Sequence, residues 1–189
     1  MSVSCDNTPN VVLSDKQSGV LRGIIIGASA TVLGVGGSML VGIDIISSGA
    51  SAADKLAFVL KSDLPIAIWL GISVGMLARH RFFTPEDIDG GGLSSGTETA
   101  RILQANLQNT LEQSVLAVLA HSMWIVSLPP ESALTIWVAV VFFVVGRVMF
   151  LVGYRKGAPA RAVGFALTFY PSMLLLAISL IWMVVGAFR

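Results

Sequence analysis

Two ionisable side chains lie deep inside apolar stretches of the sequence. Glu112 falls in NTLEQSVLAVLAH, residues 109–121, and Arg147 falls in VVFFVVGRVMF, residues 140–150. An ionisable group near the bilayer centre costs about 2.5–3.5 kcal/mol, so it persists only where it is paired or faces a polar cavity. Because the two charges are opposite and lie on neighbouring apolar runs, we predict that they are partners. The pair would either fix helix register or share a cavity with a ligand.

The first of these runs has a polar stripe that leads from its start into its middle. On an α-helix of 3.6 residues per turn, Gln108 and Glu112 lie within about 20° of Arg101. Asn109 flanks the stripe, about one turn before Glu112. A pair that only fixes register does not need a polar face of this length, so the stripe favours a ligand cavity.

Two later runs have polar faces of their own. Arg147 and Tyr154 are seven residues apart and therefore share one helix face. In the last run, Arg161, Thr168 and Ser172 align in the same way. Because the bilayer interior offers no water to polar groups, we expect these faces to meet around an enclosed polar pocket.

The sequence shows no catalytic-triad pattern, metal-ligand cluster or glycine-rich nucleotide loop. His121 lies about 180° from Glu112 on the same helix, and it has no second metal ligand at a useful spacing. We interpret His121 as interfacial or hydrogen-bonded within a bundle, and we predict no metal site. Trp124 and Trp137 lie near the predicted outer boundary, where tryptophans form aromatic belts.

The composition is that of an integral membrane protein. Hydrophobic residues make up 54% of the 189 residues, charged residues make up only 12%, and the mean hydropathy is +0.81. Soluble domains contain about 25% charged residues. The net charge of +1 gives no basic field, so no nucleic-acid partner is predicted. Cys5 is the single cysteine, which excludes an intrachain disulfide.

Five apolar spans are long enough to cross a bilayer, which takes about 20 residues. They cover residues 22–46, 64–83, 99–127, 133–154 and 161–188. We expect a polar tail over 1–21, an additional membrane helix with an outer loop over 22–63, and a four-helix membrane domain over 64–189. Cleavage of the first span at Ala50-Ser51-Ala52 is the alternative, but its apolar run exceeds the usual 7–15 residues of a signal peptide.

Basic residues predict the orientation of these spans. With the N-terminus in the cytoplasm, eight Lys and Arg residues fall inside and three fall outside. The short link SLPPES, residues 127–132, contains no basic residue, as expected for an outer turn. We therefore predict five spans, with the N-terminus cytoplasmic and the C-terminus outside.

Local patterns predict how the spans pack and begin. A stripe of small residues on the first span is typical of a helix-packing face. Its members are Gly23, Gly27, Ala30, Gly34 and Gly37. Thr84-Pro85 followed by Asp87 predicts a short helical turn. The spacing of Ser95 and Glu98 predicts a capping box that starts the third span.

Three pieces of the sequence have a familiar order and spacing. They are FFTPED at 82–87, NTLEQ at 109–113, and VGRVMFLVGYRKGAPARAVGF at 145–165. They resemble the family of membrane-associated proteins in eicosanoid and glutathione metabolism (MAPEG), and the second piece looks particularly like the N-x-x-E motif of bacterial members. In the third piece, Arg147, Tyr154 and Arg161 all keep the family spacing. The resemblance covers residues 64–189.

The resemblance implies an all-α integral membrane fold. A four-helix bundle, here preceded by one additional transmembrane helix, would assemble as a homotrimer in the bacterial inner membrane. Its sites would lie at subunit interfaces and bind glutathione together with a lipophilic small molecule or lipid. Arg161 would stabilise the glutathione thiolate. The glutathione-binding residues would be Asn109, Glu112, Arg147 and Tyr154, joined by Gln108 and Arg101 of the polar stripe.

The activity that follows is transfer of glutathione, or of another small thiol, to lipophilic electrophiles, or reduction of peroxides. Arg161 and the helix N-terminus beside it would favour the nucleophilic thiolate. Arg147 would hold a carboxylate in a bidentate pair, and Glu112 would hold an ammonium group. Asn109 and Tyr154 would add hydrogen bonds.

Two departures from the family pattern keep a second class of function open. Glutathione-using members have an arginine where this chain has Ala105, and a tyrosine where it has Phe165. The alternative is a non-catalytic lipid-binding or scaffold protein of the same fold. A transporter is disfavoured, because the sequence shows no inverted repeat and no pair of broken helices.

Overall fold

The computed structural model describes residues 13–91, 93 and 95–188, and all regular elements in this part of the chain are helices. Five long helices are α1 (Asp15–Val41), α3 (Leu64–Phe83), α4 (Glu98–Ser127), α5 (Leu134–Gly153) and α6 (Ala158–Ala187). Shorter elements are α2 (Ala52–Ser62), η1 (Pro85–Asp87), η2 (Pro130–Ala133) and η3 (Tyr154–Lys156). The predicted all-α fold is confirmed.

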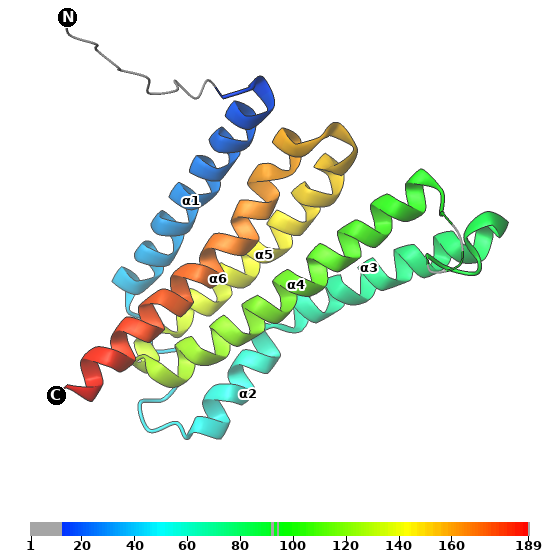
Figure 1. Ribbon diagram of the computed structural model, residues 1–189. Helices are drawn as coiled ribbons and strands as arrows, with labels where there is room; N and C mark the ends of the chain where they lie inside the picture. Colours follow the sequence, from blue (N-terminus) through cyan, green and yellow to red (C-terminus); the bar gives the residue numbers. More distant parts are fainter. Residues whose placement is uncertain (1–12, 92, 94, 189) are drawn as a thin grey trace, which may run out of the picture.

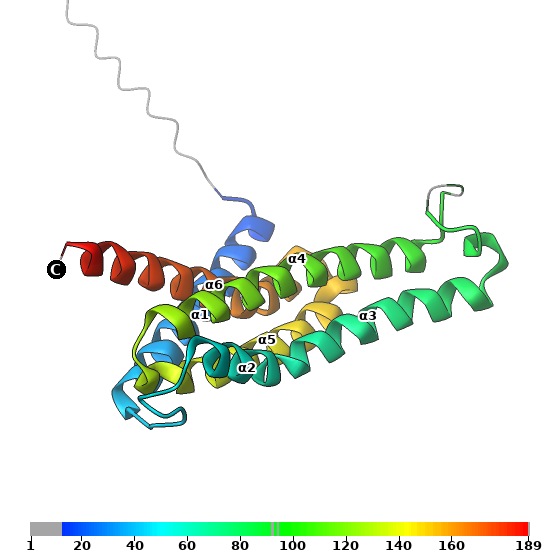
Figure 2. The ribbon, with the colours of Figure 1, turned by 90° about the horizontal axis from the view of Figure 1, so that it is seen from below.

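The long helices form a bundle whose connections lie at its two ends (Figures 1 and 2). The start of α1, the α3–α4 tip and the α5–α6 turn lie towards one end. The α4–α5 turn, α2 and the end of α6 lie towards the other. The predicted inner and outer loops are thus separated as the distribution of basic residues requires, and their orientation in the membrane stays a prediction.

Four segments of the described chain are long and apolar enough to cross a membrane. They are Asp15–Val41, Leu64–Phe83, Pro130–Lys156 and Ala158–Ala187. These segments make the protein a multi-pass integral membrane protein. Helix α4 is long enough, but its first half contains the polar stripe, so the fifth predicted span, 99–127, stays a prediction.

Helix α1 is shifted towards the N-terminus relative to the span predicted over 22–46. It begins at Asp15 and ends at Val41. Ser14 accepts a hydrogen bond from the backbone N–H of Gln17, and the Gln17 side chain accepts one from the N–H of Ser14. This capping box starts the helix at Asp15. Gly42 has a φ of 55°, a left-handed conformation that glycine adopts without strain, and it ends the helix.

The predicted outer loop contains a further helix, α2. Ser51 and Asp54 form a capping box, with the Asp54 side chain accepting from the Ser51 N–H at 3.1 Å. Val59 is buried in the bundle. Hydropathy alone missed α2, because an amphipathic helix of this length is too short and too polar to be predicted as a membrane span.

Helix α4 begins at Glu98 with Thr97 as its N-cap, so the predicted capping box of Ser95 and Glu98 is wrong. The Thr97 hydroxyl accepts a hydrogen bond from the N–H of Ala100 at 3.2 Å. Thr97 takes this position because Asp87 also binds it, as described below. The predicted short turn after Thr84 is confirmed as η1.

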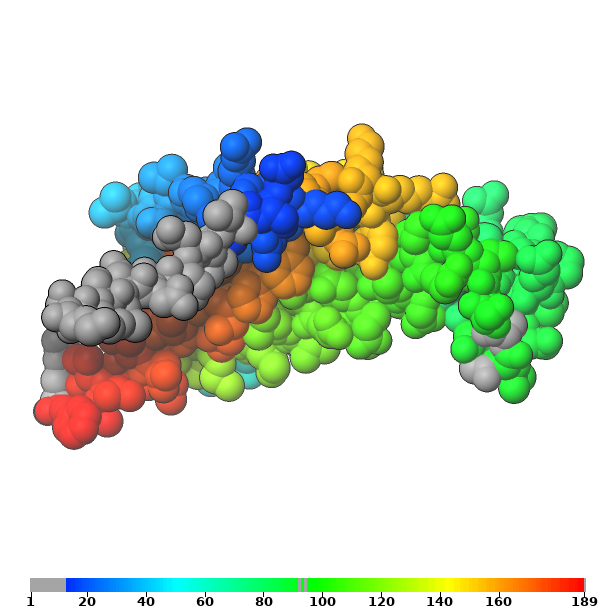
Figure 3. Space-filling view, turned by 45° about the horizontal axis from the view of Figure 1, so that its top comes forward, coloured from blue at the N-terminus to red at the C-terminus, as the bar shows by residue number. Residues whose placement is uncertain are grey.

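Helices α1 and α6 run parallel and in close contact, which Figure 3 shows as α1 lying over the first part of α6. A Cβ on Gly23 would lie 2.6 Å from the Cβ of Ala162. A Cβ on Gly27 would collide in the same way with Ala166. The predicted packing face is therefore confirmed here, since only glycine lets the two backbones approach this closely.

Gly27→Leu is expected to lower the free energy of unfolding by about 1–3 kcal/mol, the usual cost of overpacking a close contact. Gly36→Leu is the matched control on the same helix, because a Cβ there has nothing within 4 Å. Gly37, a member of the predicted stripe, has equally open surroundings. Thermal unfolding in detergent measures the difference, and equal melting of the two variants would contradict this packing.

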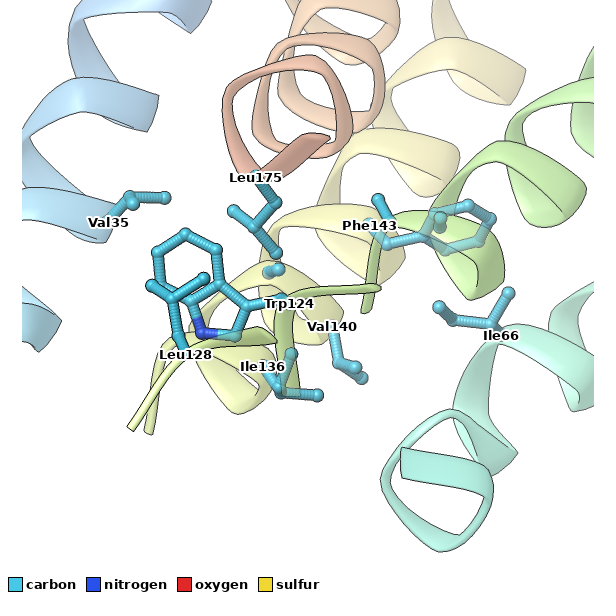
Figure 4. Close-up of a cluster of buried hydrophobic side chains, with 11 residues drawn as sticks. Val35, Ile66, Trp124, Leu128, Ile136, Val140, Phe143 and Leu175 are labelled. Carbon is cyan, nitrogen blue, oxygen red and sulfur yellow. The ribbon is translucent and has the colours of Figure 1, made fainter. Parts of the chain in front are cut away.

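A hydrophobic core fills the bundle beside α2 and the α4–α5 turn (Figure 4). Its larger members are Val35, Ile66, Trp124, Leu128, Ile136, Val140, Phe143 and Leu175. Trp124 is 0% exposed and donates its indole N–H to the carbonyl oxygen of Ser132 at 3.1 Å, so the predicted belt position is wrong for it. Trp137 is 45% exposed and donates to Oγ of Ser62 at 3.0 Å.

Candidate functional site

Two glycines bring α5 and α6 into backbone contact beneath the site. A Cβ on Gly146 would lie 2.7 Å from the carbonyl oxygen of Gly164. A Cβ on Gly164 would lie 2.6 Å from the carbonyl oxygen of Gly146. No side chain fits between these backbones, so glycine is required at both positions. The crossing places Arg147, the next residue of α5, directly against α6.

Arg147 is fully buried and joins three helices. Its Nη1 donates to Oδ1 of Asn109 at 2.8 Å, and its Nη2 donates to Oγ1 of Thr168 at 2.6 Å. The Thr168 hydroxyl in turn donates to the carbonyl oxygen of Phe165 at 2.9 Å. The guanidinium also lies 4.6 Å from the ring centroid of Phe150, within cation–π range. Arg147 therefore fixes the position of Asn109.

The predicted ion pair between Glu112 and Arg147 is wrong. Within the described residues, Glu112 accepts a hydrogen bond from Nε2 of Gln108 at 2.9 Å, on an exposed face of α4. Asn109 takes the position beside Arg147. Three residues on a helix correspond to about 300°, so Glu112 is turned about 60° away from Asn109 and points out of the chain.

Arg161 lies in the first turn of α6 and lines a pocket of about 430 Å³, here called the Arg161 pocket. Its guanidinium lies 4.3 Å from the ring centroid of Tyr154 and 5.9 Å from that of Phe150. Asn109 lines the same pocket. The structure thus brings together Arg161, Tyr154 and Asn109. The volume falls in the usual range for small-molecule sites, about 300–1,000 Å³.

A second hollow of about 440 Å³ lies beside the α3–α4 tip. It contains the predicted site residues Arg101 and Gln108, and Arg81 of α3, which donates to Oε1 of Gln104 at 3.0 Å. Ala105 lines both this hollow and the Arg161 pocket. We place the candidate site in the Arg161 pocket, because it unites a cation, an amide and a phenol with a lipophilic wall.

Asp87 of the FFTPED segment anchors the start of α4, a role that sequence reasoning missed. The Thr97 hydroxyl donates to Oδ2 of Asp87 at 2.7 Å, and the Thr97 N–H donates to Oδ1 at 2.8 Å. Nε2 of His80 lies 2.9 Å from Oδ2. The hydrogen bonds from Thr97, with a smaller contribution from His80, hold the pKa of Asp87 below its usual value.

His121 has a partner that the sequence did not reveal. Its Nδ1 lies 2.7 Å from Oδ1 of Asp63, and the side chains are only 1% and 5% exposed. This contact confirms that His121 is hydrogen-bonded within the bundle. The available signal was topological, because Asp63 precedes the second span at the predicted outer end. The described residues contain no group of three or more His, Cys, Asp or Glu side chains that could hold a metal ion.

Four apolar helices long enough to cross a membrane define a multi-pass α-helical membrane protein, and the Arg161 pocket lies within its bundle. The MAPEG family matches residues 64–181, more than half of the chain, and the protein belongs to this family. No curated protein and no solved structure matches the chain. The match begins at the first residue of α3 and leaves α1 and α2 outside.

Proposed function

We propose that the protein transfers glutathione, or a similar small thiol, to lipophilic electrophiles at the Arg161 pocket. Membership of the MAPEG family supports a glutathione-related transferase or peroxidase function at the level of the family. The observation that supports this pocket is the position of Arg161, where a fixed positive charge lines a largely apolar cavity.

Arg161 acts on the thiol in this proposal. A free thiol has a pKa of about 8.5, taking cysteine as the reference. The guanidinium and the N-terminus of α6, which contributes about half a positive charge, both favour the thiolate. Asn109 and Tyr154 supply an amide and a phenol that orient the peptide by hydrogen bonds. Asn109 is held for this task by Arg147.

The chemical step is an addition or a substitution by sulfur. With an unsaturated aldehyde, the thiolate sulfur forms a bond to the β-carbon. The π electron pair moves towards the carbonyl oxygen, and the α-carbon then takes a proton from water. The step needs no oxidant or reductant. Arg161 lowers its barrier by increasing the fraction of thiol that is ionised at neutral pH.

We also propose that the site is completed between subunits of a homotrimer. Arg101, Gln108 and Glu112 lie on an exposed face of α4 in the single chain. A carboxylate facing lipid at this depth costs about 2.5–3.5 kcal/mol, so a second copy that covers Glu112 would remove this cost. Glutathione carries an ammonium group and two carboxylates, which Glu112 and Arg101 complement in charge.

Arg161→Ala tests the assignment. If Arg161 lowers the thiol pKa by about two units, its loss is expected to reduce turnover roughly 25-fold at pH 7, with recovery as the pH approaches the pKa of the free thiol. Turnover of glutathione with chlorodinitrobenzene across pH measures this effect. Arg155→Ala is the matched control. Arg155 is an exposed arginine that lies outside the pocket and donates a hydrogen bond to Thr99.

Native mass spectrometry of the same samples separates chemistry from assembly. The variant is expected to keep the oligomeric state of the unmodified protein, because Arg161 makes no hydrogen bond that holds the described helices together. Full thiol-dependent turnover in Arg161→Ala at neutral pH would remove Arg161 from the mechanism.

The second candidate is a lipid-binding protein without catalysis, and the pocket wall favours it at two places. Ala105 and Phe165 line the Arg161 pocket as apolar side chains. Calorimetric titration of the purified protein with millimolar glutathione distinguishes the candidates. Thiol transfer predicts heat of binding and a raised melting temperature, whereas their absence would favour the lipid-binding protein.

A further inference from the structure

Helix α1 forms part of the Arg161 pocket although it lies outside the segment that matches the family. Val20 and Ile24 line the pocket together with Ala105 and Asn109 of α4. The family match starts only at residue 64. The additional helix therefore supplies a wall that the four-helix domain alone does not contain.

The pocket is polar where α6 begins, because the Arg161 guanidinium lies there, 4.3 Å from the ring centroid of Tyr154. Asn109 lies further along α6, since Arg147 binds it together with Thr168. Beyond Arg161, the lining residues of α6 are mostly apolar and aromatic, and they continue to Tyr170. Among these aromatic side chains, Phe165 stacks on Phe169, with their ring centroids 5.4 Å apart. Nine residues of helix from Arg161 to Tyr170 correspond to about 14 Å, which suits a hydrocarbon chain with one reactive end.

The width of the pocket beside Arg161 is set by the contact between α1 and α6. Gly23 lies between Val20 and Ile24 on α1, and a Cβ there would be 2.6 Å from the Cβ of Ala162. Because the two backbones are this close, Val20 and Ile24 are held at a fixed distance from α6. Substitution of these two side chains therefore changes the shape of the pocket and leaves the helix contact intact.

A second trough, of about 400 Å³ and almost wholly apolar, adjoins the pocket. It shares Val20, Ile24 and Ala158 with the Arg161 pocket and continues along α1 past Leu21. Leu21 is 44% exposed on the outer surface of α1. Val20 and Ile24 thus separate the Arg161 pocket from an apolar trough on the surface of α1.

We propose that α1 determines which electrophiles the protein accepts. Val20 and Ile24 form the wall against which the hydrocarbon chain of an unsaturated aldehyde, or an amphiphile of similar shape, lies with its reactive carbon beside Arg161. The chemistry in this inference rests on the proposed thiol transfer, whereas the wall for the chain is a property of α1 and α6.

The experiment compares Ile24→Trp with Ile26→Trp in the full-length protein in lipid nanodiscs. Ile26 is 56% exposed and does not line the pocket, so it provides a control of the same residue type on the same helix. Glutathione transfer to dodecenal and to hexenal is measured for each variant. The larger tryptophan side chain should displace about two methylene groups of the substrate, each contributing about 0.8 kcal/mol, so Ile24→Trp is expected to raise KM for dodecenal about 15-fold.

The difference in KM between the two variants decides whether α1 forms the wall for the substrate. Ile24→Trp is expected to raise KM for hexenal as well, because Ile24 lines the pocket beside Arg161, and Ile26→Trp is expected to match the unmodified protein. An unchanged KM for dodecenal in Ile24→Trp would overturn the inference and leave the proposed thiol transfer standing.

A photolabel reports on the wall without turnover. Dodecanol bearing a diazirine is expected to label the peptide that contains Val20 and Ile24, and this labelling should be lost in Ile24→Trp. Labelling of the wall in a protein that shows no thiol transfer would refute the proposed function and support the inference. Transfer without labelling of α1 would overturn the inference alone.

Discussion

Arg147→Ala is expected to lower the free energy of unfolding by about 3–5 kcal/mol. A hydrogen bond from a charged donor contributes about 1.5–3 kcal/mol, and the bonds from Arg147 to Asn109 and Thr168 are both lost. The side chain is fully buried, so its removal also leaves a cavity where α4, α5 and α6 meet. Denaturant or thermal unfolding in detergent measures the change.

Arg147→Met separates the hydrogen bonds from the volume. Methionine fills much of the same space but donates nothing, so we expect most of the destabilisation to remain. Asn109 loses its anchor in this variant, and thiol transfer should fall with it. Arg155→Ala, at an exposed arginine, should change stability by no more than about 0.5 kcal/mol. A methionine variant as stable as the unmodified protein would show that the polar network does not hold the helices together.

Asp63→Ala is expected to lower the free energy of unfolding by about 1–3 kcal/mol, the usual effect of leaving a buried hydrogen-bonding group without its partner. The pair joins the residue before α3 to α4 across 58 positions of sequence, with both side chains almost fully enclosed. His121 would then remain in an apolar environment without its acceptor. The melting temperature in detergent should fall accordingly.

A double-mutant cycle tests whether Asp63 and His121 act as a unit. Leucine at both positions removes both polar groups, so the double variant is expected to lose less stability than the sum of the two single variants. Asp44→Ala, at an exposed carboxylate of the α1–α2 connection, is the control and should be nearly neutral. Strict additivity of the two leucine substitutions would mean that the 2.7 Å contact contributes no coupling energy.

The long helices were predictable because the length of an apolar run alone determines whether it can span a bilayer. The residues at which these helices begin and end were harder to predict. The capping box of Ser14 moved the start of α1, and the capping box of Ser51 produced α2 in a segment predicted as a loop. Such caps depend on one or two side chains and leave hydropathy almost unchanged.

Only part of the predicted set of site residues comes together in the structure, because Arg101 and Gln108 line the other hollow. The spacing of Tyr154 and Arg161, together with Asn109, placed three side chains around one pocket. The partner of Arg147 was assigned by opposite charge, which selected Glu112. The rotation of α4 instead turns Asn109 towards α5. Arg147 therefore donates to the neutral oxygens of Asn109 and Thr168. Rotation depends on the packing of all neighbouring helices, which one sequence does not encode locally.

The parallel contact of α1 with α6 has a practical consequence for work on the protein. The first turn of α1 lies at the same end of the bundle as Arg161, whereas α6 finishes at the opposite end (Figure 1). An affinity tag or fluorescent reporter fused after the last helix would therefore stand far from Arg161, whereas the same fusion directly ahead of Asp15 would stand at the end of the bundle that contains it.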